Sequence, residues 1–281
     1  MKKLMSGAAL ATCAGIAAIP SASAQTSVTV YGIIDAAVEH YTNADAAGKD
    51  MTRLPSLGGG MFPSRLGFRG NEDLGGGLKA VFALENGFAP DTGVAGQGGR
   101  LFGRQAWVGL AGSWGQLTVG RNYNMMTVST YDIDLFGPSQ YGLGSLDSFI
   151  PNGRSDNSVA YKGTFNGLTV GATYSLGRDT SSAGGPAGTN CAGENPADSR
   201  QCREWSGMLR YDSGAYSVVA AYDRVHGGPA AAAGLGTSDA EDSRFHVGGL
   251  AKFGVAKVGG GVILRDNDGN PLTPRSRLYY L

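Results

Sequence analysis

Three histidines are the residues best suited to acid–base chemistry in this chain, and none lies in a catalytic pattern. A hydrolytic site needs a base beside a nucleophile, most often histidine with serine or aspartate. His40, His226 and His246 lie in no recognisable motif of that kind, and the H-E-x-x-H metal pattern is absent. Gly75-Gly76-Gly77 is interpreted as a turn and not as a phosphate loop, because no helix follows it. The sequence therefore predicts no enzyme, no metal site and no cofactor.

The longest polar connection spans residues 122–156 and contains the carboxylates Asp132, Asp134 and Asp147 among aromatic side chains. A long ordered loop is more often functional than idle. Its aromatic residues and its Gly137-Pro138 pair favour a loop that packs against a wall. We interpret the three carboxylates as candidate selectivity groups.

The N-terminus has the parts of a secretory signal. Lys2 and Lys3 supply positive charge, an apolar stretch follows, and an A-x-A pattern ends at Ala24. We therefore predict a signal peptide over residues 1–24 and a mature chain over residues 25–281.

Export would place Cys191 and Cys202 outside the reducing cytosol, within one loop. A disulfide between them is plausible, and two free loop thiols are the alternative.

The bulk composition is rich in glycine and poor in charge. Of 281 residues, 47 are glycine and 16% are charged, against about 25% charged residues in average proteins. A hydrophobic fraction of 42% is too high for disorder, and no stretch after the leader approaches the ~20 apolar residues of a membrane-spanning helix. Basic and acidic residues number 23 each, so no nucleic-acid partner is predicted.

Alternation of apolar and polar residues recurs along the chain and predicts short strands. In residues 28–39, Val28 and Val30 share one face, while Tyr31 and Asp35 share the other. We expect about a dozen strands and no amphipathic helix of useful length. The predicted strands are residues 28–39, 61–69, 78–85, 101–110, 116–121, 157–163, 168–176, 204–211, 215–224, 244–253, 256–265 and a last one beginning near Arg277.

Short and long connections alternate between these strands. The short ones are residues 71–77, 111–115, 164–167, 212–215 and 254–256, and the long ones are 42–60, 89–100, 122–156, 177–203 and 225–243. This alternation is typical of bacterial outer-membrane barrels, whose strands cross the bilayer at a tilt. An all-β, transmembrane antiparallel barrel is therefore favoured. A soluble sandwich, which would turn its apolar faces inward, is the alternative.

Four segments carry, in order, a resemblance to a known family. The most specific is SRLGFRGNEDLGGGLKA at residues 64–80, and residues 27–35, 99–110 and 117–121 match further landmarks. Together they resemble the general trimeric porins of beta-proteobacteria over about residues 25–265. The resemblance implies a sixteen-stranded barrel, a homotrimer, and a third extracellular loop folded into the lumen as a constriction.

The chain stops at Leu281, a few residues into the last expected strand. An open barrel edge in lipid would leave backbone groups unpaired, and the family's chains run further, to an aromatic last residue. We therefore expect a C-terminal truncation, with about twelve of the sixteen strands present.

The resemblance also implies an arginine cluster on the inner wall, facing the constriction loop at about residues 122–156. Arg65 and Arg104 match wall arginines on the second and fourth strands, and Arg154 matches one just after the loop. Arg121 is a weaker candidate for the same cluster.

Strand alternation places the same side chains inward, with Arg65 opposite Leu66 and Arg104 opposite Trp107. Arginine stays charged at any relevant pH and tolerates neighbouring cations. Carboxylates that face arginines across a narrow opening set a transverse field, which tunes ion selectivity. Further inward charges are expected at Lys79, Lys162, Asp35, Glu39 and Glu85.

These features predict a porin of the bacterial outer membrane, in contact with lipid and lipopolysaccharide. Ions and small hydrophilic solutes would diffuse through it passively, with anions slightly favoured by the arginines. The alternative function is a surface β-protein that acts as a binding or adhesion module. The Gly, Ala and Ser content of loops 177–203 and 225–243 speaks against that alternative.

Overall fold

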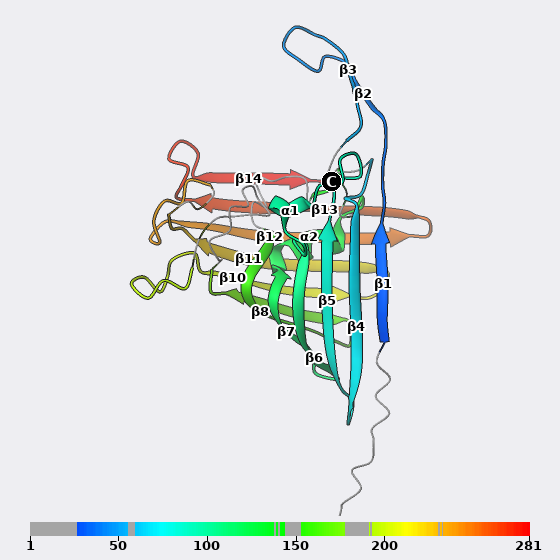
Figure 1. Ribbon diagram of the computed structural model, residues 1–281, viewed down its shortest axis with the longest axis vertical. Coiled ribbons are helices and arrows are strands. Elements are labelled where there is room, and N and C mark those ends of the chain that lie inside the picture. Colours follow the sequence, from blue (N-terminus) through cyan, green and yellow to red (C-terminus); the bar gives the residue numbers. More distant parts are fainter. Residues whose placement is uncertain are drawn as a thin grey trace, which may run out of the picture.

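One large antiparallel sheet dominates the chain (Figure 1). The computed structural model describes residues 27–55, 60–137, 139, 141–143, 153–177, 191, 193–229, 231 and 233–281. Twelve strands form the sheet in the order β1-β4-β5-β6-β7-β8-β9-β10-β11-β12-β13-β14, which follows the sequence except that β2 and β3 lie outside the sheet. The count agrees with the expected dozen. The predicted leader over residues 1–24 and the candidate Asp147 lie outside the described residues.

The strands of the sheet are β1 (Ser27–Ile33), β4 (Arg65–Gly75), β5 (Leu78–Gly87), β6 (Gln105–Gly112), β7 (Gly115–Tyr123), β8 (Arg154–Phe165), β9 (Leu168–Ser175), β10 (Glu204–Asp212), β11 (Tyr216–His226), β12 (Glu241–Phe253), β13 (Ala256–Asn267) and β14 (Arg275–Tyr280). A separate hairpin consists of β2 (Glu39–Tyr41) and β3 (Met51–Arg53). The helical segments are α1 (Gly96–Gly99) and α2 (Met125–Ile133).

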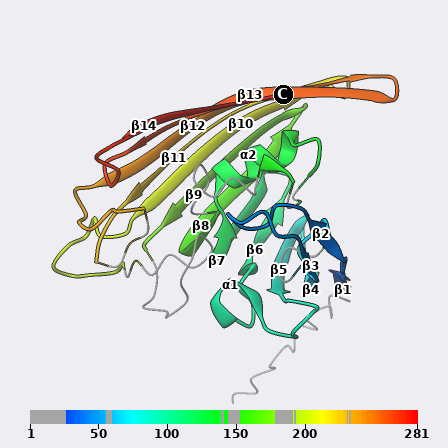
Figure 2. The same cartoon turned by 90° about the horizontal axis from the view of Figure 1, so that it is seen from above.

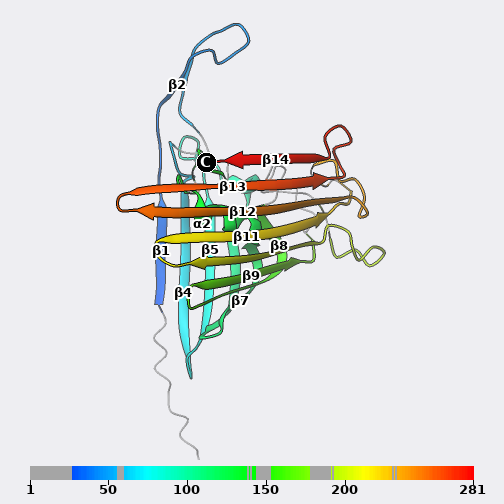
Figure 3. The same ribbon diagram turned by 180° about the vertical axis from the view of Figure 1, so that it is seen from behind.

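The sheet is strongly curved. In Figure 1 and from behind in Figure 3, β1 and β4 run almost at right angles to β10–β14, and the β2–β3 hairpin projects beyond β1. Seen from above, the sheet wraps around α2, which lies on its concave side (Figure 2). This curvature is that of a barrel wall and not of a flat sheet.

The two faces of the sheet have opposite chemical character. Large apolar side chains are exposed on the surface, with exposed fractions of 62% for Val30, 55% for Val108 and 54% for Leu209. Many of the buried side chains are charged or polar, among them Glu85 and Arg244. A soluble sandwich would bury its apolar faces, so this pattern argues against that alternative. It is the pattern of a membrane barrel with an apolar outer surface and a polar lumen.

The connections alternate in length as predicted. Gly75, Gly76 and Gly77 form the tight β4–β5 turn, all three with positive φ, and the Gly75 N–H donates to the Asp73 carboxylate over 2.8 Å. Only glycine adopts three such conformations in succession without strain. The run is therefore a turn, as the sequence analysis interprets it.

The first strand is shorter than predicted. β1 ends at Ile33 and does not continue to residue 39. Beyond it, the Asp35 carboxylate accepts hydrogen bonds from the backbone of Gly60, Met61 and Phe62 over 2.9, 3.0 and 2.8 Å. A short polar side chain that binds backbone N–H groups competes with regular pairing, so the strand pattern alone overestimates β1.

A nine-residue helix, α2, forms inside the longest loop, and the sequence pattern does not predict it. Asn124 caps it, with its side chain accepting from the Thr127 N–H over 2.9 Å. The helix is buried on most sides, so its sequence lacks the polar stripe by which an amphipathic helix is recognised. Within the described ranges, no helix combines the length and apolar character that crossing a bilayer requires.

Candidate functional site

A chain of hydrogen bonds crosses the concave face from β1 to β8. The Tyr31 hydroxyl donates to Glu85 Oε2 over 2.9 Å, and Arg104 Nε donates to Glu85 Oε1 over 2.5 Å. The Tyr123 hydroxyl then accepts from Arg104 Nη2 over 3.1 Å and from Arg154 Nη2 over 3.2 Å. We call these five residues the arginine chain. They bring together two of the predicted cluster arginines.

Aromatic contacts link the arginine chain to α2. The Arg154 guanidinium lies 4.8 Å from the centre of the Tyr123 ring, a cation–π distance. The edge of that ring meets Tyr131 of α2, with centroids 5.9 Å apart and planes at 75°. Helix α2 therefore touches the arginine-bearing wall directly.

The three predicted arginines also act electrostatically on Tyr131. Burial raises the pKa of its hydroxyl. The positive charges of Arg154, Arg104 and Arg65 oppose that rise. All three side chains are thus close enough to α2 to act on one buried hydroxyl.

Arg65 opens β4, where its Nη1 lies 3.5 Å from the Pro63 carbonyl oxygen. Arg69, four residues further along β4 on the same face, places its guanidinium 5.2 Å from the centre of the Tyr31 ring. Within the part of the chain that the structure describes, Arg65, Arg69 and Arg154 form no ion pair. This stretch of wall therefore carries an excess of positive charge.

The alternation argument for Arg104 is wrong in one detail, because Trp107 does not face away from the lumen. The Trp107 indole N–H donates to Gln105 Oε1 over 3.0 Å, and both side chains line a cavity shared with Tyr123. Arg104 precedes β6, which begins at Gln105. Strand alternation therefore does not extend to Arg104, and its inward orientation comes from its bonds to Glu85 and Tyr123.

Arg121 lies beside the cluster in a different setting. Its Nη1 donates to Asp156 Oδ1, and its Nε donates to the Gly103 carbonyl over 2.8 Å. Arg100 donates to the other oxygen of Asp156 over 2.8 Å. Arg121 is thus charge-compensated and ties the β5–β6 loop to the wall.

Two of the loop carboxylates, Asp132 and Asp134, bind groups outside the arginine chain. Asp132 lies 3.2 Å from Arg210 Nη1 of β10. Asp134 accepts from the backbone of Phe136 over 2.9 Å and of Leu143 over 2.6 Å, and so shapes the turn after α2. The sequence identified these side chains but not their partners.

Polar bonds attach the N-terminal end of α2 to β10. The Met125 N–H donates to Ser206 Oγ over 2.8 Å, and Asn124 Nδ2 donates to Glu204 Oε1 over 2.9 Å. Apolar packing completes the attachment and uses Met125, Ile133, Met208, Val219 and Ala221. The helix is fixed against the wall formed by β10, β11 and β12.

A serine–histidine contact joins α2 to β12. Ser129 Oγ lies 2.8 Å from His246 Nδ1, and His246 Nε2 lies 2.7 Å from the Tyr280 hydroxyl. Ser129 donates its own hydrogen to the Met126 carbonyl over 2.7 Å, so it accepts from His246. Ser129 and His246 are fully buried. The contact therefore holds the helix and does not activate a nucleophile.

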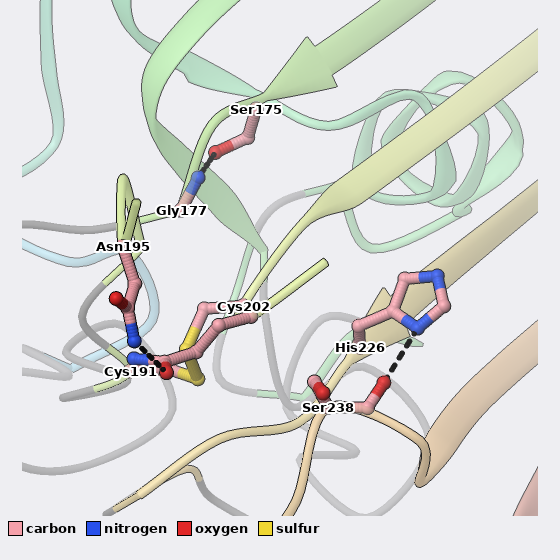
Figure 4. The surroundings of a disulfide bond; sticks show 8 residues. Ser175, Gly177, Cys191, Asn195, Cys202, His226 and Ser238 are labelled. Atoms are coloured by element: carbon pink, nitrogen blue, oxygen red, sulfur yellow. Dashed lines mark hydrogen bonds between the residues drawn. A yellow bond between two sulfur atoms is a disulfide. The ribbon is translucent and has the colours of Figure 1, made fainter. Parts of the chain in front are cut away.

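The disulfide between Cys191 and Cys202 is present, with a Cα–Cα distance of 5.5 Å (Figure 4). The backbone N–H of Cys202 donates to the Gly227 carbonyl over 3.0 Å, and Arg200 forms an ion pair with Asp239. The disulfide loop is therefore attached to the neighbouring loop between β11 and β12.

Comparisons with known proteins agree with this architecture. Residues 8–281 match the sequence profile of a family described as Gram-negative porin. An outer membrane porin protein of Bordetella pertussis is 37% identical over 272 residues, which cover 92% of this chain and 68% of that protein. Outer membrane porin protein 32 of Delftia acidovorans is 34% identical, with coverages of 89% and 67%. The solved anion-selective porin from Comamonas acidovorans superposes with a TM-score of 0.65 at 27% identity, over 88% of this chain and 70% of that one.

Proposed function

This chain belongs to the Gram-negative porin family, and from that premise we propose that the channel it forms in the outer membrane favours anions at its constriction. The channel function and the outer-membrane location follow from the family and from its named relatives. The preference for anions and the residues responsible for it are what we propose in addition.

One observation carries the proposal: the arginines on this wall outnumber the carboxylates that could neutralise them. Glu85 is bound by Arg104, whereas Arg65, Arg69 and Arg154 have no carboxylate partner among the described residues. Asp132 and Asp134 of the long loop are engaged elsewhere.

Fixed charges on a narrow, polar lumen raise the local concentration of counter-ions. Arginine suits this role because it remains protonated and keeps a fixed donor geometry. Chloride and small carboxylates would therefore pass more readily than potassium. The name of the Comamonas acidovorans relative, an anion-selective porin, supports the same preference.

The remaining functional expectations are part of the same proposal. The protein would assemble as a homotrimer, with its apolar outer face against lipid, lipopolysaccharide and neighbouring subunits. Ions and small hydrophilic solutes would cross it passively. Residues 1–24 would be removed on export, which intact-mass measurement of the purified protein tests directly.

The test is the zero-current potential of the full-length protein in a planar bilayer under a KCl gradient. Discrete conductance steps with an anion-selective sign are expected. The double variant R65S/R104S should shift the permeability toward potassium. R200S, which removes an arginine from an exposed loop pair, is the matched control and should leave the potential unchanged. A wild-type channel that prefers potassium contradicts the proposal.

A further inference from the structure

We infer that Tyr123 is a positioning residue for anion selectivity, whose hydroxyl oxygen holds Arg104 and Arg154 together at the constriction. The inference rests on the proposed anion preference and identifies the group that maintains it. Tyr123 is the last residue of β7, directly before the cap of α2.

The geometry is a shared acceptor. Arg104 reaches the Tyr123 oxygen from the position just before β6 over 3.1 Å, and Arg154 reaches it from the start of β8 over 3.2 Å. The two guanidinium groups are therefore separated by only two hydrogen bonds. That separation is shorter than the Debye length of about 10 Å at 0.1 M salt, so an ion in the lumen experiences both charges at once.

Like charges at this spacing repel each other, so each guanidinium group needs a stabilising contact that holds it in place. Arg104 has a second anchor, because its Nε donates to Glu85. Arg154 has a weaker one, the face of the Tyr123 ring at 4.8 Å. Its Nε is buried and has no hydrogen-bond partner within the described residues. The Tyr123 hydroxyl is thus the polar group that keeps Arg154 beside Arg104.

The hydroxyl also has a hydrogen of its own to donate. Accepting two N–H groups occupies both lone pairs of the oxygen, and among the described residues no acceptor takes the O–H hydrogen. Tyr123 is half-buried and lines a cavity with Gln105, Asn122 and Met125. A passing anion would therefore meet one hydroxyl donor between two guanidinium groups.

Tyr123→Phe isolates this role, because it removes one oxygen and keeps the ring that contacts Arg154 and Tyr131. Tyr161→Phe is the matched control. Tyr161 lies on β8, the strand of Arg154, and its hydroxyl donates over 2.6 Å to the Trp114 carbonyl in the β6–β7 turn. Both substitutions delete one tyrosine hydroxyl from the same wall, but only Tyr123 contacts the arginines.

The experiment measures the zero-current potential of wild type, Y123F, Y161F, R154S and Y123F/R154S in planar bilayers under a KCl gradient. Heat-modifiable electrophoretic mobility verifies that each variant is folded. We expect Y123F to lower the chloride-to-potassium permeability ratio by about twofold or more, as spreading of a focused charge does. Y161F should match wild type. In the R154S background, removal of the hydroxyl should have no further effect, because a single arginine remains to be held.

The outcomes separate the two proposals. If wild type is anion-selective and Y123F equals it, or if Y123F causes the same drop with and without Arg154, the positioning role is overturned and the anion preference stands. If the wild-type channel shows no anion preference, the proposed function fails, and the positioning role fails with it.

Discussion

Tyr31 donates a 2.9 Å hydrogen bond to Glu85, and this bond ties β1 to β5 across the intervening strand β4. Glu85 also binds Arg104, so it is the negative member of an otherwise positive stretch of wall. Separate substitutions of Glu85 and Tyr31 therefore distinguish the effect of the negative charge from that of the hydrogen bond.

Glu85→Gln should increase the preference for chloride over potassium. The amide keeps a hydrogen-bonding oxygen for Arg104 and removes one negative charge from the lumen, so the local potential becomes more positive. Tyr31→Phe is the control, since it deletes the hydrogen bond between Tyr31 and Glu85 without changing the charge. Zero-current potentials in a KCl gradient check both variants. Equal shifts in E85Q and Y31F would contradict an electrostatic role for Glu85.

Asp156→Asn should destabilise the folded barrel. Asp156 joins Arg100 and Arg121, and all three side chains are at most one-fifth exposed. Removing one partner of a buried pair costs about 3 kcal/mol or more, because it leaves uncompensated charge. The apparent unfolding temperature in detergent, followed by circular dichroism, should therefore fall clearly.

Asp239→Asn provides the matched control for that substitution. Its pair with Arg200 is largely exposed, with side-chain exposures of 78% and 61%. Surface ion pairs contribute about 1 kcal/mol at most, so D239N should unfold close to wild type. Equal losses in D156N and D239N would show that the Asp156 pair is not a structural anchor.

Reduction of the Cys191–Cys202 disulfide should expose its loop to protease. Both cysteines are buried, and a disulfide of this kind contributes roughly 2–4 kcal/mol to the structure that it closes. Trypsin should then cleave after Arg200 and Arg203 about tenfold faster or more, since local opening controls cleavage. The oxidised protein is the reference. An unchanged rate would mean that other contacts hold this loop.

The loop anchored by Asp35 should lose stability in acid. The backbone N–H groups of Phe62, Met61 and Gly60, in that order of effect, hold the pKa of Asp35 below its ordinary value. A carboxyl whose folded pKa is depressed stabilises the fold above its unfolded pKa. That contribution is lost as the pH falls through the folded value.

Asp35→Asn tests this expectation, because asparagine keeps the shape and cannot titrate. The wild-type apparent unfolding temperature should fall between neutral and strongly acidic pH by more than that of D35N. Parallel pH profiles for the two proteins would rule out Asp35 as the titrating group.

Much of the wall could be predicted because strand patterns are local. Alternation and loop lengths are enough for a barrel, and Arg65 occupies the inward position that its spacing from Leu66 indicates. Tyr123 could not be recognised in the same way. Its role depends on Arg104, which precedes β6, and on Arg154, which begins β8, and no spacing in the sequence encodes their contact with Tyr123.

The long loop at residues 122–156 illustrates the same limit of sequence-based prediction. Asp132 and Asp134 were identified as charged groups in a long loop, yet they bind Arg210 and the backbone after α2. Those partners follow from the docking of α2 against β10, and the docking depends on packing between segments far apart in the chain. The signal that could have been used is the asparagine cap at Asn124, which marks the start of a helix.

The attachment of the Cys191–Cys202 loop to its neighbour determines how the cell surface displays this protein. Cys202 and Gly227 share a backbone hydrogen bond, and Arg200 and Asp239 form an ion pair across the same two loops. Long barrel loops face outward, so the two segments would form one composite surface for an antibody. An antibody that recognises it would depend on the native fold and would fail to bind either loop as a separate peptide.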